Sequence, residues 1–129
     1  MEAHNIRAAL ADLPFLTITS ATTSEDVMAS VRQFTSFNQC MLGVTHFSGL
    51  TPWERHPDGD ELLYVLDGEI DVTILTDAGR VLTTVSVGSV SVVPRGLWHR
   101  QEPRPSVTLL FATPSATTEV SWADDPRRE

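Results

Sequence analysis

The pattern of apolar and polar residues changes character near residue 38 of this 129-residue chain. Beyond that point, short apolar or alternating segments are separated by glycine and proline, which interrupt strands. These segments are QCMLGVTHFS at 39–48, ELLYVL at 61–66, EIDVTIL at 69–75, VLTTVSV at 81–87, SVSVV at 89–93 and SVTLLFAT at 106–113. Short strands with turn signals roughly every ten residues are typical of an all-β sandwich or barrel.

Two of the interruptions have the composition of hairpin turns. Asp67-Gly68 stands between ELLYVL and EIDVTIL, and Asp77-Ala78-Gly79 stands between EIDVTIL and VLTTVSV. Both sequences favour tight turns because glycine reaches positive φ at little cost. The sequence therefore predicts a hairpin at each position.

The first 37 residues have a different pattern and predict an N-terminal extension. Residues 1–13 predict a short helix capped by Asn5 and ended by Pro14, and PFLTIT at 14–19 predicts an edge strand. The segment 24–34 fits an amphipathic helix or a strand about equally well. We therefore expect an extension at 1–37, a barrel at 38–122 and a frayed tail, ADDPRRE, at 123–129.

Composition and charge exclude several classes of function. The net charge is −8, and the nine basic residues are scattered, which argues against nucleic acid as a partner. We see neither an apolar run long enough to span a membrane nor a secretory signal at the N-terminus. The single cysteine, Cys40, excludes an intramolecular disulfide and a cysteine-based zinc cluster. These features predict a cytoplasmic protein.

Potential metal ligands gather in two segments, WERHPDGDELLYVLDGE at 53–69 and GSVSVVPRGLWHRQEP at 88–103. Glu54 and His56 are two residues apart, so in an extended segment their side chains leave the same face. Glu61 follows a loop that can fold back beside this pair, and His99 follows a Pro-x-Gly turn. Two imidazoles and two carboxylates predict a site for one divalent first-row metal ion, with positions left for water or substrate.

These two segments resemble the two motifs of the cupin superfamily. The first family motif has two histidines one residue apart, then a glutamate, six residues and a glycine; its second histidine, glutamate and glycine match His56, Glu61 and Gly68. The second motif matches at Gly88, Pro94, Gly96 and His99. The resemblance covers about residues 40–112. It implies a cupin or jelly-roll β-barrel, also called a double-stranded β-helix, with a short N-terminal helix.

The chain departs from the family pattern at three positions. Glu54 stands where the family has its first histidine, the opening glycine of the first motif is shifted to Gly49, and Pro103 replaces a frequent asparagine. A carboxylate at position 54 favours Fe, Mn, Ni or Zn as divalent ions over Cu(I). Alternatively, Glu54 turns away from a three-ligand site and acts as a catalytic general base.

Each candidate ligand also has a simpler interpretation. His56 and His99 could be hydrogen-bonded histidines on the barrel rim, and Glu61 could cap the preceding turn. Three further residues, His46, Tyr64 and Trp98, are candidates for substrate binding. The simpler and more common role is a hydrogen-bonded strand histidine for His46 and core or dimer packing for the two aromatic residues. Arg95 and Arg100 flank His99; solvent exposure is expected, but either could hold a substrate carboxylate.

The resemblance implies a metal-dependent enzyme that acts on a small organic molecule by oxygenase, isomerase or cyclase, or lyase chemistry. Two alternatives remain open: a non-catalytic module that binds a metal or small ligand, and a barrel that binds no metal and keeps full stability after chelation. ELLYVL and VTLLFAT look apolar on both faces. Together with the family resemblance, this predicts a homodimer in which a partner sheet covers the outer face.

Overall fold

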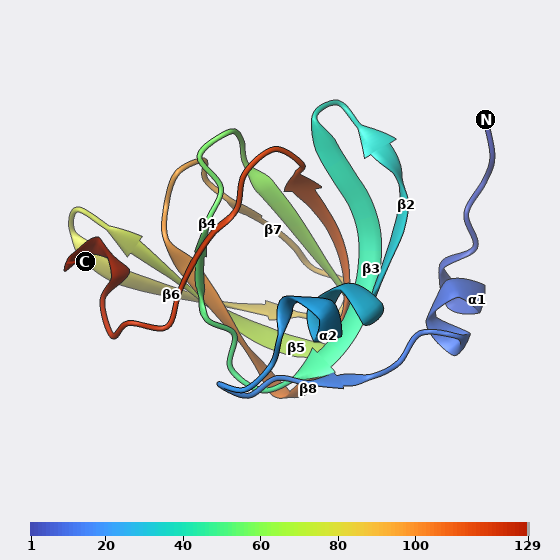
Figure 1. The fold of residues 1–129 in the computed structure, drawn as a ribbon, viewed down its shortest axis with the longest axis horizontal. Coiled ribbons are helices and arrows are strands. Elements are labelled where there is room, and N and C mark those ends of the chain that lie inside the picture. Colours follow the sequence, from blue (N-terminus) through green and yellow to red (C-terminus); the bar gives the residue numbers. More distant parts are fainter. Residues whose placement is uncertain (129) are drawn as a thin grey trace.

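The computed structural model describes residues 1–128, and most of them lie in strands of one curled sheet (Figure 1). Within this range the strands are β1 (Leu16–Thr17), β2 (Val31–Phe37), β3 (Cys40–Ser48), β4 (Trp53–Arg55), β5 (Glu61–Thr76), β6 (Gly79–Ser86), β7 (Val90–Val93), β8 (His99–Pro114) and β9 (Glu119–Ser121). The helices are α1 (Ile6–Ala11), α2 (Ser24–Ala29) and a 3-10 helix at Pro126–Arg128. The predicted all-β jelly-roll fold is confirmed.

Two long strands, β5 and β8, form the longest strand pair of the sheet. They pair antiparallel from Leu62 opposite Ala112 to Ile74 opposite His99. The first part of β5 also pairs with β7 and the later part with β6, while β8 pairs with β3. Because each long strand has different neighbours at its two ends, the sheet curls around a core. That core comprises Phe47, Leu63, Val65, Ile70, Val72, Val85, Val93, Val107 and Leu109.

The predicted hairpin turn at Asp67-Gly68 is wrong. The chain runs straight through this dipeptide as part of β5, and the pairing with β8 shifts register between Val65 and Asp67. Gly68 has φ of +76°, and a Cβ atom there would lie 2.1 Å from the carbonyl oxygen of Ser106. The glycine therefore serves a β-bulge with close backbone approach. The hairpin at 77–79 is confirmed, since Thr76 pairs with Gly79 across it.

The N-terminal residues cover one side and one opening of the barrel. Asn5 caps α1 as predicted, because its Oδ1 accepts a hydrogen bond of 2.8 Å from the backbone N–H of Ala8. The ambiguous segment 24–34 contains both predicted elements, since α2 ends at Ala29 and β2 begins at Val31. Thr23 and Asp26 form a capping box that starts α2. No helix of residues 1–128 is long and apolar enough to cross a membrane.

The C-terminal residues 123–128, where a frayed tail is predicted, make contacts with the barrel. Pro126 is buried, and the Arg127 guanidinium binds Asp125 and donates a hydrogen bond of 3.0 Å to the backbone oxygen of Thr76. These contacts anchor the 3-10 helix to the end of β5. The last residue of the predicted tail, at position 129, lies outside the described residues.

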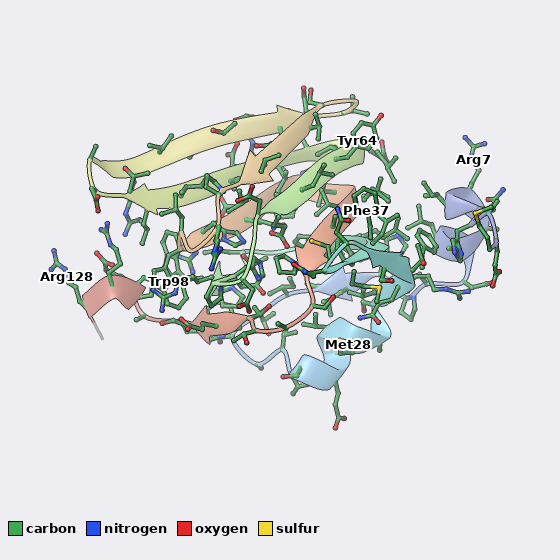
Figure 2. The ribbon with its side chains drawn as sticks, turned by 90° about the horizontal axis from the view of Figure 1, so that it is seen from above. Arg7, Met28, Phe37, Tyr64, Trp98 and Arg128 are labelled. Atoms are coloured by element: carbon green, nitrogen blue, oxygen red, sulfur yellow. The ribbon has the colours of Figure 1, made fainter. Side chains whose placement is uncertain are left out.

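The outer face of the sheet is partly exposed in the single chain. Leu62 and Tyr64 on β5 lie opposite Val92 and Val90 on β7, and both valines are exposed. Figure 2 places Tyr64 on the side of the sheet away from Met28 in α2. Among residues 1–128 the two valines stay exposed, so the burial of ELLYVL on both faces, which was predicted against a partner sheet, stays a prediction.

Candidate metal centre

Three of the predicted ligands meet inside the barrel. His56 follows β4, Glu61 is the first residue of β5, and His99 is the first residue of β8. All three side chains are buried, and one potential ligand atom of each lies within 4.8 Å of the other two. Residues from three separate segments therefore converge on one point, as the two motifs predict.

Backbone contacts between the two motif loops bring these segments together. The N–H of Gly96 donates a hydrogen bond of 3.0 Å to the carbonyl oxygen of His56. The N–H of Arg95 donates to Oδ1 of Asp60 at 2.7 Å, and its guanidinium Nε donates to the carbonyl oxygen of Pro57 at 2.6 Å. The turn before His99 is thus fixed against the loop that joins the other two ligands.

The rings are oriented through the nitrogen atoms that face away from the meeting point. Nδ1 of His99 donates to the carbonyl oxygen of Leu97 at 3.2 Å, and Nδ1 of His56 lies 3.1 Å from the Thr118 hydroxyl oxygen. The Thr113 hydroxyl donates to Oε2 of Glu61 at 2.5 Å. Such outer hydrogen bonds fix the tautomer and direction of ligating side chains. Both Nε2 atoms are left available for a ligand.

The atoms at the meeting point lack hydrogen-bond partners among the described residues. They are Nε2 of His56, Oε1 of Glu61 and Nε2 of His99. Nε2 of His99 lies 3.2 Å from Oε1 of Glu61, and Nε2 of His56 lies 3.4 Å from Oε2, without hydrogen-bond alignment. Buried polar atoms are nearly always paired, so three orphaned acceptors that face one another fit a bound cation. The donor set suits a divalent first-row metal.

The neighbouring imidazoles keep the Glu61 carboxylate charged. Burial raises the pKa of the Glu61 carboxyl, but the imidazoles of His56 and His99 outweigh it and bring the pKa down to about 2. For His99, burial lowers the pKa, but the carboxylates of Glu61 and Glu54 outweigh it and raise the pKa. A negative charge is therefore maintained in a buried site that attracts positive charge.

Glu54, the fourth predicted ligand, lies beside this group rather than within it. Its Cα is paired with that of His99 across β4 and β8, and its side chain lines the cavity described below. Burial, followed by the charge of Glu61, raises the pKa of the Glu54 carboxyl. Whether Glu54 ligates the metal or acts as a base stays a prediction.

A cavity of about 710 Å³ opens beside the three ligands. His56, Glu61 and Glu54 form part of its wall. The rest comes from the inner face of the sheet, from the N-terminal segment at 16–33, and from residues 114–122 near the C-terminus. In Figure 1 the α2 helix and the C-terminal segment lie in front of the barrel opening, on its two sides. The volume is in the range of small-molecule sites in proteins.

The three predicted substrate-binding residues lie elsewhere. Nε2 of His46 is 2.8 Å from the carbonyl oxygen of Leu13, so this histidine fastens the N-terminal segment. Tyr64 is on the outer face of β5. Trp98 lies in a loop, and the guanidinium carbon of Arg55 is 4.8 Å from the centre of the Trp98 ring. None of the three lines the cavity. Arg95 and Arg100 also lie outside it and donate to backbone oxygens.

Sequence reasoning missed several residues that support or line the site. Gln101 lies two residues after His99 on the same inward face of β8, and Thr113 occupies the same face farther along. Side chains two residues apart on a strand share a face, so the position of His99 could have identified Gln101 as a residue that faces the site. Thr118 follows a loop, and no periodic signal marked it.

Comparison with known proteins agrees with this geometry. A family model described as a cupin domain matches residues 47–103. Germin-like protein subfamily 2 member 2 of Arabidopsis thaliana is 46% identical over 55 residues, which are 42% of this chain and 25% of that protein. The chain spans about a quarter to two fifths of the length of the curated relatives it matches.

Solved structures show the same fold at low sequence identity. A cupin-2 domain containing protein from Shewanella frigidimarina superposes with a TM-score of 0.58 and 20% identity, covering 74% of this chain and 95% of that one. Oxalate decarboxylase of Bacillus subtilis, a protein with Mn(II) centres, superposes with a TM-score of 0.57 and 16% identity over 64% of this chain and 24% of its own. With both motifs converging on one buried group, these similarities show that the chain has the cupin fold and that residues 47–103 match a cupin domain.

Proposed function

We propose that this cupin is a metal-dependent enzyme that acts on a small organic molecule, with His56, Glu61 and His99 as the metal ligands. The observation that carries the proposal is the set of three buried, unpartnered ligand atoms beside a cavity that can hold a substrate. A bound divalent metal would polarise a substrate oxygen for isomerase, cyclase or lyase chemistry or, if redox-active, would support oxygenase chemistry.

The protein's own residues prepare the site for this chemistry. The Leu97 carbonyl fixes the ring of His99, and Thr113 holds the Glu61 carboxylate in place. The cavity wall excludes water from the substrate, which strengthens electrostatic interactions there. Glu54 is placed on the wall beside the ligands, where it can serve as a fourth ligand or take up a substrate proton.

Metal content tests the proposal directly. We expect about one transition-metal ion per chain, Fe, Mn, Ni or Zn, when purified protein is examined by elemental mass spectrometry. The His99→Ala variant should lose it because one of three ligands is gone. His46→Ala is the matched control, since His46 is a half-buried histidine of the same sheet whose ring contacts Leu13. Failure of the wild type to hold any of these ions after reconstitution would contradict the proposal.

A second candidate is a non-catalytic binding module. Among the described residues that line the cavity, the carboxylate and imidazole side chains are confined to Glu54, His56 and Glu61. If all three serve the metal, no acid or base remains for turnover. The Glu54→Gln variant separates the candidates. An enzyme that uses Glu54 as a base keeps its metal and loses turnover, whereas a binding module in which Glu54 is a ligand holds its metal more weakly.

A further inference from the structure

The cavity wall carries information about the substrate beyond the metal site. We propose that the bound molecule is uncharged and largely apolar, with oxygen donors at one end only; this rests on the proposed function, because the metal ligands define the polar end. The wall is apolar on both sides. Phe47, Leu63 and Phe111 come from the sheet, and Leu16, Ile18 and Val27 come from the N-terminal segment.

The mouth of the cavity is also apolar. Val27 and Met28 of α2 and Val120 and Trp122 near the C-terminus line the cavity and are exposed to solvent. Figure 2 shows Met28 on the side of the sheet opposite Tyr64. Exposed apolar residues around an opening are a feature of ligand-binding sites, because they lose water contact when a ligand enters. An apolar molecule would therefore gain binding energy along the whole passage.

The distribution of charge argues against an anionic substrate. All nine basic residues of the chain are arginines, and none lines the cavity. The wall instead contains two carboxylates, Glu54 and Glu61, which offset the charge of a divalent ion. A dicarboxylate or phosphate would bring further negative charge into a buried site that provides no cationic side chain to pair with it.

One buried polar group is available to a neutral ligand. Gln101 lines the cavity at 7% exposure, and its side chain ends in a carboxamide. A carboxamide offers both a donor and an acceptor. On the same face as His99, it can bind a hydroxyl or carbonyl next to the metal-binding end of the molecule. An uncharged ligand with a polar head and an apolar body matches all of these features.

The first test uses metal-free protein and the neutral fluorescent probe N-phenyl-1-naphthylamine. We expect Val27→Asp to weaken binding of the probe at least about 10-fold, because it places a charge in the apolar wall. Val27 is 40% exposed, so the helix tolerates the change, and Val120→Asp provides a second variant from the other side of the mouth. Val90→Asp is the matched control on the outer face, where probe affinity should stay within about twofold.

The second test uses Ni(II)-loaded protein and three chelators that displace the probe. 2-Naphthohydroxamic acid and acetohydroxamic acid are uncharged in solution and present the same metal-binding head, which releases one proton to the solvent when it chelates the ion, whereas oxalate is a dianion before it binds. We expect the naphthyl compound to bind at least about 100-fold more tightly than acetohydroxamic acid, an effect that burial of about four carbon atoms supplies. Oxalate should bind more weakly than the naphthyl compound.

Two results would overturn the inference. The first is tighter binding of oxalate than of the naphthyl compound. The second is probe binding that is lost in Val90→Asp and unchanged in both Val27→Asp and Val120→Asp. The second result would assign the probe to the outer face. If the protein holds no metal, the proposed function fails, while the probe experiment on metal-free protein still decides whether the cavity takes neutral apolar molecules.

Discussion

The two faces of β5 show how one strand serves two purposes. Glu61, Leu63 and Val65 face inward and are buried, whereas Leu62 and Tyr64 face outward and are partly exposed. Both faces are largely apolar, so hydrophobicity alone does not distinguish them. The distinguishing residue is an acid on the buried face. A buried carboxylate costs folding free energy unless it is paired, and Glu61 lies beside the Thr113 hydroxyl and the imidazoles of His56 and His99.

The largest expected difference is in the free energy of unfolding, between substitutions of neighbouring leucines on the two faces. Leu63 is 1% exposed and belongs to the core, whereas Leu62 is 36% exposed. Leu63→Ala should lower the free energy of unfolding by about 2–5 kcal/mol because it removes buried carbons and leaves a cavity. Leu62→Ala should cost less than about 1 kcal/mol. Urea unfolding followed by circular dichroism measures both, and equal losses would contradict the assignment of the faces.

Metal removal tests the inner face next. If the ligands bind a metal, chelation should lower the free energy of unfolding by about 2.7 kcal/mol at a free metal concentration 100 times the dissociation constant. The His99→Ala variant should show no such dependence on chelator. Full stability of the wild type after chelation would instead support a barrel in which the motif residues hold the fold without metal.

The outer face should contribute to association more than to the stability of one chain. Homodimer formation stays a prediction, and Val92 on β7 lies opposite Leu62 and is 50% exposed. Val92→Asp should halve the molar mass measured by light scattering and change the unfolding free energy of the chain by less than about 1 kcal/mol. Val87→Asp, in the turn after β6, is the control. A monomeric wild type would show that the homodimer prediction is wrong. The predicted cytoplasmic location has no bearing on these measurements.

Local signals predicted most strands and the three grouped ligands. Motif spacing was sufficient for His56, Glu61 and His99 because turns fix where each neighbouring strand begins. Tyr64, a candidate for substrate binding, does not line the cavity, and its separation of three from Glu61 already places it on the opposite face of a strand. His46 is a different case. Its face depends on how β3 pairs with β8, and its partner, Leu13, comes from a segment whose docking no local pattern indicates.

The cavity itself could not be predicted from the barrel motifs. Much of its wall comes from residues 16–33, before the segment matched by the cupin family, and from residues 114–122 after it. The ambiguous segment 24–34 illustrates the reason. Helix and strand propensities were both correct there, but the capping box at Thr23 and the break at Ser30 decide where one ends and the other begins.

The β-bulge after Val65 changes which residues of β5 face the core. Before it, residues with odd numbers face the core, as at Glu61, Leu63 and Val65; after it, residues with even numbers do so, as at Ile70 and Val72. Deleting one residue at the bulge would turn either the ligand-bearing half or the hairpin half inside out. Comparisons of this protein with its relatives should therefore treat the two halves of the strand as separately aligned units.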